Sequence, residues 1–169
     1  AHWERGGNNW NQVCHAGMTA GALALLEDDP ARAAEAVARA VAGVPYAMKV
    51  YVPDGTYPEG PGYWNYGTTM NVVLIELLRS ALGTDFGLSA SEGFLKSGDF
   101  ILQMTGPTRQ WFAFSDCGAG GGFSLAMPWF ASQTKRGDLL WYETPMLGDE
   151  IAEMRSGLGA WSAGRLFPL

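Results

Sequence analysis

Residues 53–67 read P-D-G-T-Y-P-E-G-P-G-Y-W-N-Y-G and separate two stretches of helical periodicity. The segment holds four glycines, three prolines, three tyrosines and one tryptophan. Proline removes a backbone donor and glycine loosens the backbone, so this composition predicts a loop rather than a long helix. Aromatic rings beside Asp54 and Glu59 are suited to contacting sugars and to acid–base chemistry. We therefore expect an ordered loop that contacts a ligand.

Helical patterns dominate the first half of the chain. A first helix is predicted over residues 10–26, and a second begins after Asp29, a good N-cap, with Pro30 at its first position. Pro45 lies inside the second helix and predicts a kink or a break. A third helix, capped by Thr68 or Thr69, ends at Gly83. The apolar residues of the second helix follow helical spacing on one face: Val37, Ala40, Val41, Val44 and Met48.

The pattern weakens after residue 88. Short helices are predicted over residues 92–104, 123–134 and 138–146. Gly98 interrupts the first, and Pro128 and Pro145 limit the other two. Residues 111–114 predict a brief extended segment. The glycine-rich residues 117–122 lack the Gly-Lys-Ser/Thr ending of a phosphate loop. The chain is thus expected to be one mainly α-helical domain, residues 1–169, built from helical hairpins.

Composition excludes several classes of partner. The net charge of −6, with 11 Lys and Arg, argues against a nucleic-acid partner. No run approaches the roughly 20 apolar residues of a membrane span. Cys14 and Cys117 lack metal-ligand spacing, and both a bridge and two free thiols stay open. We expect no metal and no cofactor.

Three stretches, taken in order, resemble the heparinase II/III-like polysaccharide lyases, which are related to alginate lyases. They are N-N-W-N-Q-V-C at residues 8–14, Y-V-P-D-G-T-Y-P-E-G-P-G-Y-W-N-Y-G at 51–67, and 94–116 with its T-G-P and F-A-F-S-D. The resemblance implies an (α/α) toroid followed by a β-sandwich region, and a periplasmic or secreted location. This chain matches only part of the toroid and lacks the β-sandwich region, so we expect weak or no activity from it alone.

The chemistry of such lyases can be argued from the substrate. A uronic-acid polymer is cleaved by removing the C5 proton and expelling the O4 leaving group, and the adjacent carboxylate must be neutralised first. A tyrosine or histidine serves as base and acid. The resemblance implies Tyr66 in that role, and Asn9, Asn11 or His15 as the neutralising group. His15 follows Asn11 by four residues and so shares its helix face.

The acidic saccharide itself is expected to contact Trp10, Glu59, Tyr63 and Trp64. Other interpretations stay open. The asparagines could cap a helix, and Tyr66 could simply pack a loop. The chain could be a toroid glycoside hydrolase with Asp54 and Glu59 as acid and base, or a non-catalytic carbohydrate-binding or scaffold domain. Helix faces left uncovered by the partial toroid predict a homo-oligomer.

Overall fold

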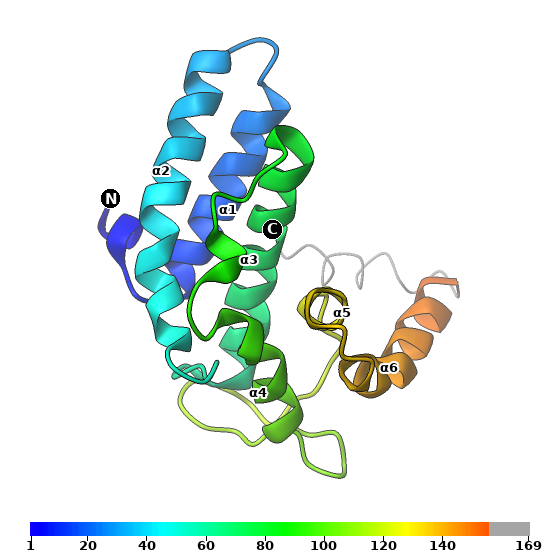
Figure 1. The fold of residues 1–169 in the computed structure, drawn as a ribbon. Coiled ribbons are helices and arrows are strands. Elements are labelled where there is room, and N and C mark those ends of the chain that lie inside the picture. Colours follow the sequence, from blue (N-terminus) through cyan, green and yellow to red (C-terminus); the bar gives the residue numbers. More distant parts are fainter. Residues whose placement is uncertain (156–169) are drawn as a thin grey trace.

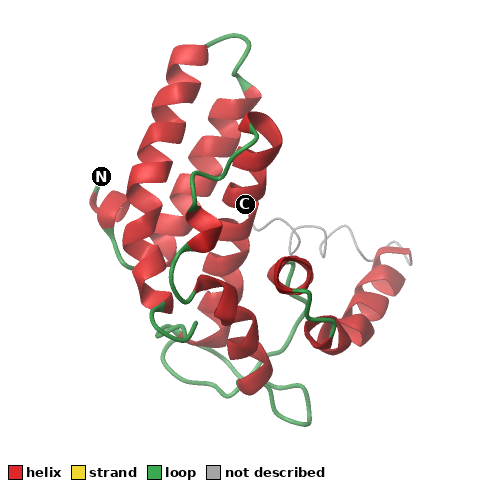
Figure 2. Ribbon diagram, viewed as in Figure 1, coloured by secondary structure: helices red, strands yellow, loops and turns green. Residues whose placement is uncertain are grey.

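The computed structural model describes the backbone of residues 1–155 and their side chains except at 141, 142, 146, 149, 150 and 153–155. The described part is mainly helical and contains no strand, which confirms the expected mainly-α class. Figure 2 shows helices connected by loops over this part of the chain. The elements, in order, are η1 (His2–Arg5), α1 (Asn9–Ala24), α2 (Pro30–Met48), η2 (Lys49–Tyr51), α3 (Gly60–Leu82), η3 (Leu88–Ala90), η4 (Phe94–Lys96), α4 (Ser97–Gln103), α5 (Ala126–Thr134) and α6 (Asp138–Arg155).

Three long helices form the main body (Figure 1). α1 packs against both α2 and α3. α1 and α3 run in the same direction and α2 runs opposite to them, so the N-terminal ends of α1 and α3 and the C-terminal end of α2 lie together at the lower end of the view (Figure 1). α5 and α6 pack against one another on the side of α3.

Aromatic side chains fill the core where α3 meets the later elements. The ring of Trp64 stacks on Phe130 with centroids 6.2 Å apart, and Phe94 meets Tyr51 edge-on at 5.0 Å. The Trp64 indole donates a 2.6 Å hydrogen bond to the Ser97 hydroxyl, so its polar atom is satisfied inside the core. The two Trp64 contacts join α3 to α5 and α4, and the contact between Phe94 and Tyr51 joins η4 to η2.

The predicted aromatic loop is shorter than expected, because α3 begins at Gly60 and residues 60–67 are helical. Neither Thr68 nor Thr69 is therefore a cap. Pro61 lies in the first helical turn, where its missing N–H costs nothing. Gly60 has φ +85°, which only glycine adopts easily, and a Cβ there would lie 2.8 Å from the Phe114 carbonyl oxygen.

The remaining helix boundaries can be compared with those predicted from the sequence. Asp29 caps α2 as predicted, since its Oδ1 accepts from the Arg32 N–H at 3.0 Å, and Gly83 ends α3 in the left-handed region. The predicted limit at Pro145 is wrong, because α6 continues through it. α2 also continues through Pro45, so this proline does not break the helix. Gly98 lies within α4 instead of interrupting it. Residues 111–114 form no strand, and Trp111 takes part only in an isolated bridge to Thr105.

Candidate functional site

The two motifs that suggested a site meet at the N-terminal ends of α1 and α3. Asn9 is the first residue of α1 and Glu59 is the N-cap of α3. Glu59 Oε2 accepts a 3.0 Å hydrogen bond from Asn9 Nδ2 and a longer one, 3.4 Å, from its backbone N–H. Residues 50 positions apart in sequence are thus joined by one carboxylate.

A glycine allows this close approach of α1 and α3. A Cβ at Gly67 would overlap Gln12 Oε1, would lie 2.9 Å from the Tyr57 hydroxyl and would lie 3.1 Å from Asn9 Cβ. The side of α3 that carries Gly67 therefore faces the start of α1 directly. Tyr66 directly precedes Gly67 in α3.

A buried hydrogen-bond network links α1 and α3 beside the contact between Asn9 and Glu59, which we call the junction. The Tyr57 hydroxyl donates to Gln12 Oε1 at 3.0 Å, and Gln12 Nε2 donates to the Tyr51 hydroxyl at 2.7 Å. The Tyr51 hydroxyl also lies 2.8 Å from Thr68 Oγ1. Burial raises the pKa of both Tyr51 and Tyr57 above the usual range of a phenol, so both stay neutral and hold the junction rather than take protons. Sequence reasoning missed Gln12 and Tyr51, although Gln12 is one turn after Asn9 on the face that meets α3.

Tyr66, like Tyr63, is a tyrosine of this region whose hydroxyl is available. Its side chain is half-buried, and its hydroxyl has no hydrogen-bond partner among the residues that the structure describes. Tyr63 lies one turn earlier on the same face of α3 and packs partly against the core. Trp10, at the second position of α1, is 62% exposed. A phenol and two aromatic surfaces are thus accessible near the joined motifs.

Asn11 and His15 lie together, but on the side of α1 that faces η1 and α2. Asn11 Nδ2 donates to the Glu4 carbonyl at 3.0 Å and to the Gly43 carbonyl at 3.1 Å, so both amide hydrogens are in use. His15 Nε2 lies 3.2 Å from the same Glu4 carbonyl, and burial lowers the pKa of its imidazole. Both residues fix η1 and α2 against α1, and neither is joined to α3.

Two further expectations change with the structure. Trp64, expected to bind a sugar, is fully buried and belongs to the core. Asp54, one carboxylate of the hydrolase interpretation, is exposed and accepts a 3.3 Å hydrogen bond from the Thr56 N–H within its own turn. Glu59, the other carboxylate, is engaged by Asn9, so the structure gives the pair no shared arrangement.

The two cysteines are free thiols. Cys117 Sγ accepts a 3.1 Å hydrogen bond from the Gly62 N–H, which fastens the glycine-rich loop to the first turn of α3. No helix in the described residues is long and apolar enough to cross a membrane. The described side chains also include no group of His, Cys, Asp and Glu that could hold a metal ion.

No family profile matches the chain, and no curated protein matches it significantly.

The number of free N–H donors on the Asn9 amide indicates what the junction of α1 and α3 can do chemically. An asparagine amide carries two N–H donors. Asn9 gives one to Glu59 and has no second acceptor within the described part of the chain. One oriented amide donor and one available phenol are the groups that proton abstraction beside a carboxylate requires.

Proposed function

We propose that this chain is part of a polysaccharide lyase of the heparinase II/III-like kind, which cleaves uronic-acid-containing polysaccharide by β-elimination. The observation that carries the proposal is the hydrogen bond between Asn9 and Glu59. It joins the N-N-W-N motif to the P-E-G-P-G-Y-W-N-Y-G motif, the two stretches on which the resemblance depends. An enzyme that needs one group from each motif requires such a meeting.

Each residue of the junction has a role in the proposed reaction. Tyr66 removes the C5 proton through its hydroxyl and then protonates the O4 leaving group, so one phenol acts as base and acid. Asn9 donates its second amide hydrogen to the substrate carboxylate, which stabilises the enolate that forms when the proton leaves. Glu59 orients that amide. Asn9 fits this role better than Asn11, whose two amide hydrogens are engaged, or than His15, whose Nε2 lies against the Glu4 carbonyl on the side of α1 that faces η1 and α2.

Trp10 and Tyr63 are the aromatic surfaces proposed to hold the sugar rings. Their rings offer an apolar face to the C–H face of a pyranose. An acidic polymer approaching a chain of net charge −6 also needs cations close to its path.

The arrangement of the long helices supports the toroid that the proposal includes. α1 and α2 form an antiparallel hairpin, and α1 and α3 are parallel neighbours (Figure 1). Equivalent helices of successive hairpins are related in this way when hairpins stack side by side. Stacked hairpins leave an apolar face open wherever the next hairpin is not present.

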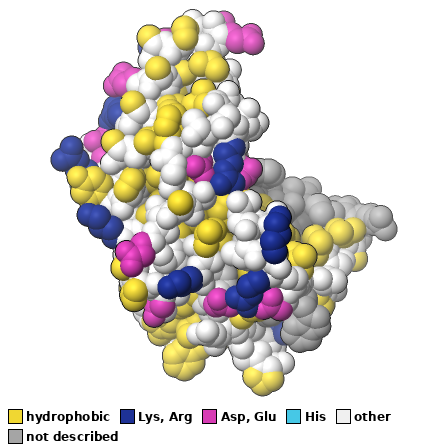
Figure 3. All heavy atoms as spheres, viewed as in Figure 1, with side chains coloured by type: hydrophobic (Ala, Val, Ile, Leu, Met, Phe, Trp, Pro, Cys, Tyr) yellow, Lys and Arg dark blue, Asp and Glu magenta, His cyan; other side chains and the backbone are white. Residues whose placement is uncertain are grey.

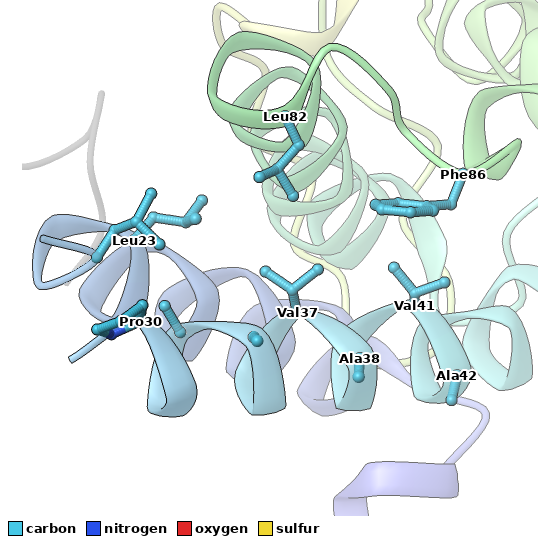
Figure 4. Close-up of a pocket in the computed structure, with 11 residues that line it drawn as sticks. Leu23, Pro30, Val37, Ala38, Val41, Ala42, Leu82 and Phe86 are labelled. Carbon is cyan, nitrogen blue, oxygen red and sulfur yellow. The ribbon is translucent and has the colours of Figure 1, made fainter.

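An apolar groove gives the expected homo-oligomer a specific surface. Its volume is about 510 Å³, and Figure 4 shows Leu82 and Phe86 facing Val37 and Val41 of α2 across it. Phe86 is 51% exposed. We propose that two copies associate through this groove, because exposed apolar surface of this kind favours association. The residues that line it are Leu23, Leu26, Pro30, Ala33, Ala34, Val37, Ala38, Val41, Ala42, Leu82 and Phe86.

The product of the reaction tests the proposed function. The full-length natural protein is incubated with alginate, heparan sulfate and related polymers. A lyase leaves a conjugated C4–C5 double bond, so ultraviolet absorbance should rise in step with new reducing ends. New reducing ends without absorbance would indicate hydrolysis and would overturn the proposal. Binding without either signal would leave a carbohydrate-binding domain.

A further inference from the structure

Arg5 and Lys49 converge on one exposed aromatic ring at the end of α2. Arg5 Cζ lies 5.8 Å from the centroid of the Tyr46 ring, and Lys49 Nζ lies 5.2 Å from it. Tyr46 is 39% exposed. We call these three residues the Tyr46 patch.

The two cations of the Tyr46 patch are among the five of the nine described lysines and arginines that form no ion pair with a carboxylate. Four arginines form ion pairs with carboxylates: Arg32, Arg39, Arg79 and Arg136. Neither Arg5 nor Lys49 has a carboxylate partner among the described residues. Two like charges held near one ring repel each other, and an anion bound between or beside them would relieve that repulsion. Figure 3 shows positive and negative side chains interleaved over the lower half of the face in view.

A hollow of about 280 Å³ adjoins the patch. It is lined by Arg5 and Tyr46 together with Arg39, His15 and Glu4. Glu4 is the one carboxylate in this lining, and it is paired with Arg39. The volume lies near the lower limit of roughly 300 Å³ for small-molecule sites, which suits a single ring rather than a large ligand.

The position of the patch relates it to the junction of α1 and α3. Arg5 ends η1, which leads into α1, and Lys49 follows directly on α2. The C-terminal end of α2 and the N-terminal ends of α1 and α3 lie at one end of the helices (Figure 1). A long polymer crossing this end could therefore contact both places.

We propose that the Tyr46 patch binds one carboxylate-bearing sugar ring of an acidic saccharide, as a subsite separate from Tyr66. The apolar face of the ring stacks on Tyr46, and its carboxylate accepts hydrogen bonds from the Arg5 guanidinium and the Lys49 ammonium. The proposal rests on the proposed function only for the kind of polymer. Binding at the patch requires no bond cleavage.

Titration calorimetry of the 169-residue chain tests the patch. The probes are an alginate hexasaccharide and, as the neutral counterpart, cellohexaose. Arg5→Gln and Lys49→Gln should each weaken alginate binding roughly tenfold, the scale of one hydrogen bond to a charged group. Tyr46→Leu should weaken it as well. Lys135→Gln makes the same change of charge at an exposed position at the end of α5 and should have no effect.

Several outcomes would overturn the patch. They are equal binding of the two probes, an equal loss in Lys135→Gln, and tighter binding of a single-stranded oligonucleotide than of alginate. Turnover separates this proposal from the catalytic one. Binding that depends on Arg5 and Lys49, together with no lyase product from the full-length protein, supports the patch and counts against the catalytic proposal. Lyase product from Arg5→Gln and Lys49→Gln variants that bind alginate as tightly as wild type supports the catalytic proposal and counts against the patch.

Discussion

At the scale of the residue, Asn9 and Asn11 differ in how many of their side-chain N–H donors are free of a hydrogen bond within the described residues. They are two positions apart on α1, and both are buried. Asn11 spends both amide hydrogens on the carbonyls of Glu4 and Gly43, whereas Asn9 spends one on Glu59. A group without a spare donor cannot neutralise a substrate carboxylate unless the structure rearranges.

This difference predicts that alanine at the two positions affects different quantities, turnover at Asn9 and stability at Asn11. In the full-length protein, Asn9→Ala should lower turnover about 100- to 1,000-fold, the usual effect of removing one such donor. Asn11→Ala should lower the free energy of unfolding by about 1–3 kcal/mol, because two buried carbonyls lose their donor. Urea unfolding and initial rates measure the two quantities. The assignment fails if Asn11→Ala abolishes turnover at unchanged stability.

Glu143 predicts a pH dependence of folding. Its Oε2 accepts from the Ser124 N–H at 3.0 Å, its Oε1 has no hydrogen-bond partner among the described residues, and burial raises its pKa from 4.5 to about 7. Between these two values the folded state binds more protons than the unfolded state. The free energy of unfolding should therefore fall as pH rises through this range, by up to about 3 kcal/mol.

Glu143→Gln tests this dependence, because an amide does not titrate. Its free energy of unfolding should lack the fall between pH ~4.5 and ~7 that burial of the carboxyl produces. Urea unfolding of both proteins at a series of pH values gives the comparison. Parallel curves for variant and wild type would exclude Glu143 as the source.

At the scale of the element, the contact between α1 and α3 depends on Gly67. Alanine favours a helix over glycine by about 1 kcal/mol, but a methyl group here would overlap Gln12. Crowding of a packed contact costs about 1–3 kcal/mol, so we expect Gly67→Ala to be destabilising. Gly17→Ala is the matched control, since no atom in the described part of the chain lies within 4 Å of its Cβ position, and it should be stabilising. Thermal unfolding of both variants gives the comparison, and a stabilising Gly67→Ala would contradict the close contact.

The helix boundaries also indicate how much of the fold could be predicted from the sequence. Asp29, Pro30 and Gly83 act locally, and they mark the start of α2 and the end of α3 as predicted. Residues 60–67 were expected in a loop because proline and glycine usually break helices. Proline is tolerated in a first turn, and the packing around Gly67 favours a residue without a side chain.

The candidate site was predictable to a similar extent. The two motifs indicated that an asparagine of the first stretch would lie near the second, and Asn9 does. Sequence could not choose among Asn9, Asn11 and His15, because the acceptors that occupy Asn11 come from η1 and α2 through tertiary contacts. Trp64 was expected at a sugar site because of its aromatic ring, yet its side chain is buried in the core.

At the scale of the whole molecule, the apolar groove predicts association. We expect dimers at tens of micromolar, where interfaces of about −6 to −7 kcal/mol become populated. Phe86→Ser should shift the chain to monomer in sedimentation. Phe112→Ser removes a ring that is 69% exposed but lies outside the groove, and it should leave the dimer intact. A wild-type monomer at this concentration would contradict the prediction.

The central claim is that the joined motifs form a lyase site with Tyr66 as base and acid. The most direct measurement is the kcat and KM of Tyr66→Phe in the full-length protein, followed by the absorbance of unsaturated product. Phenylalanine keeps the ring, so packing and KM should change little, while kcat should fall by at least about 100-fold. Tyr63→Phe, one turn away on the same face, should keep kcat near wild type. Wild-type turnover in Tyr66→Phe would contradict the account and would leave Tyr66 a packing or sugar-contacting residue.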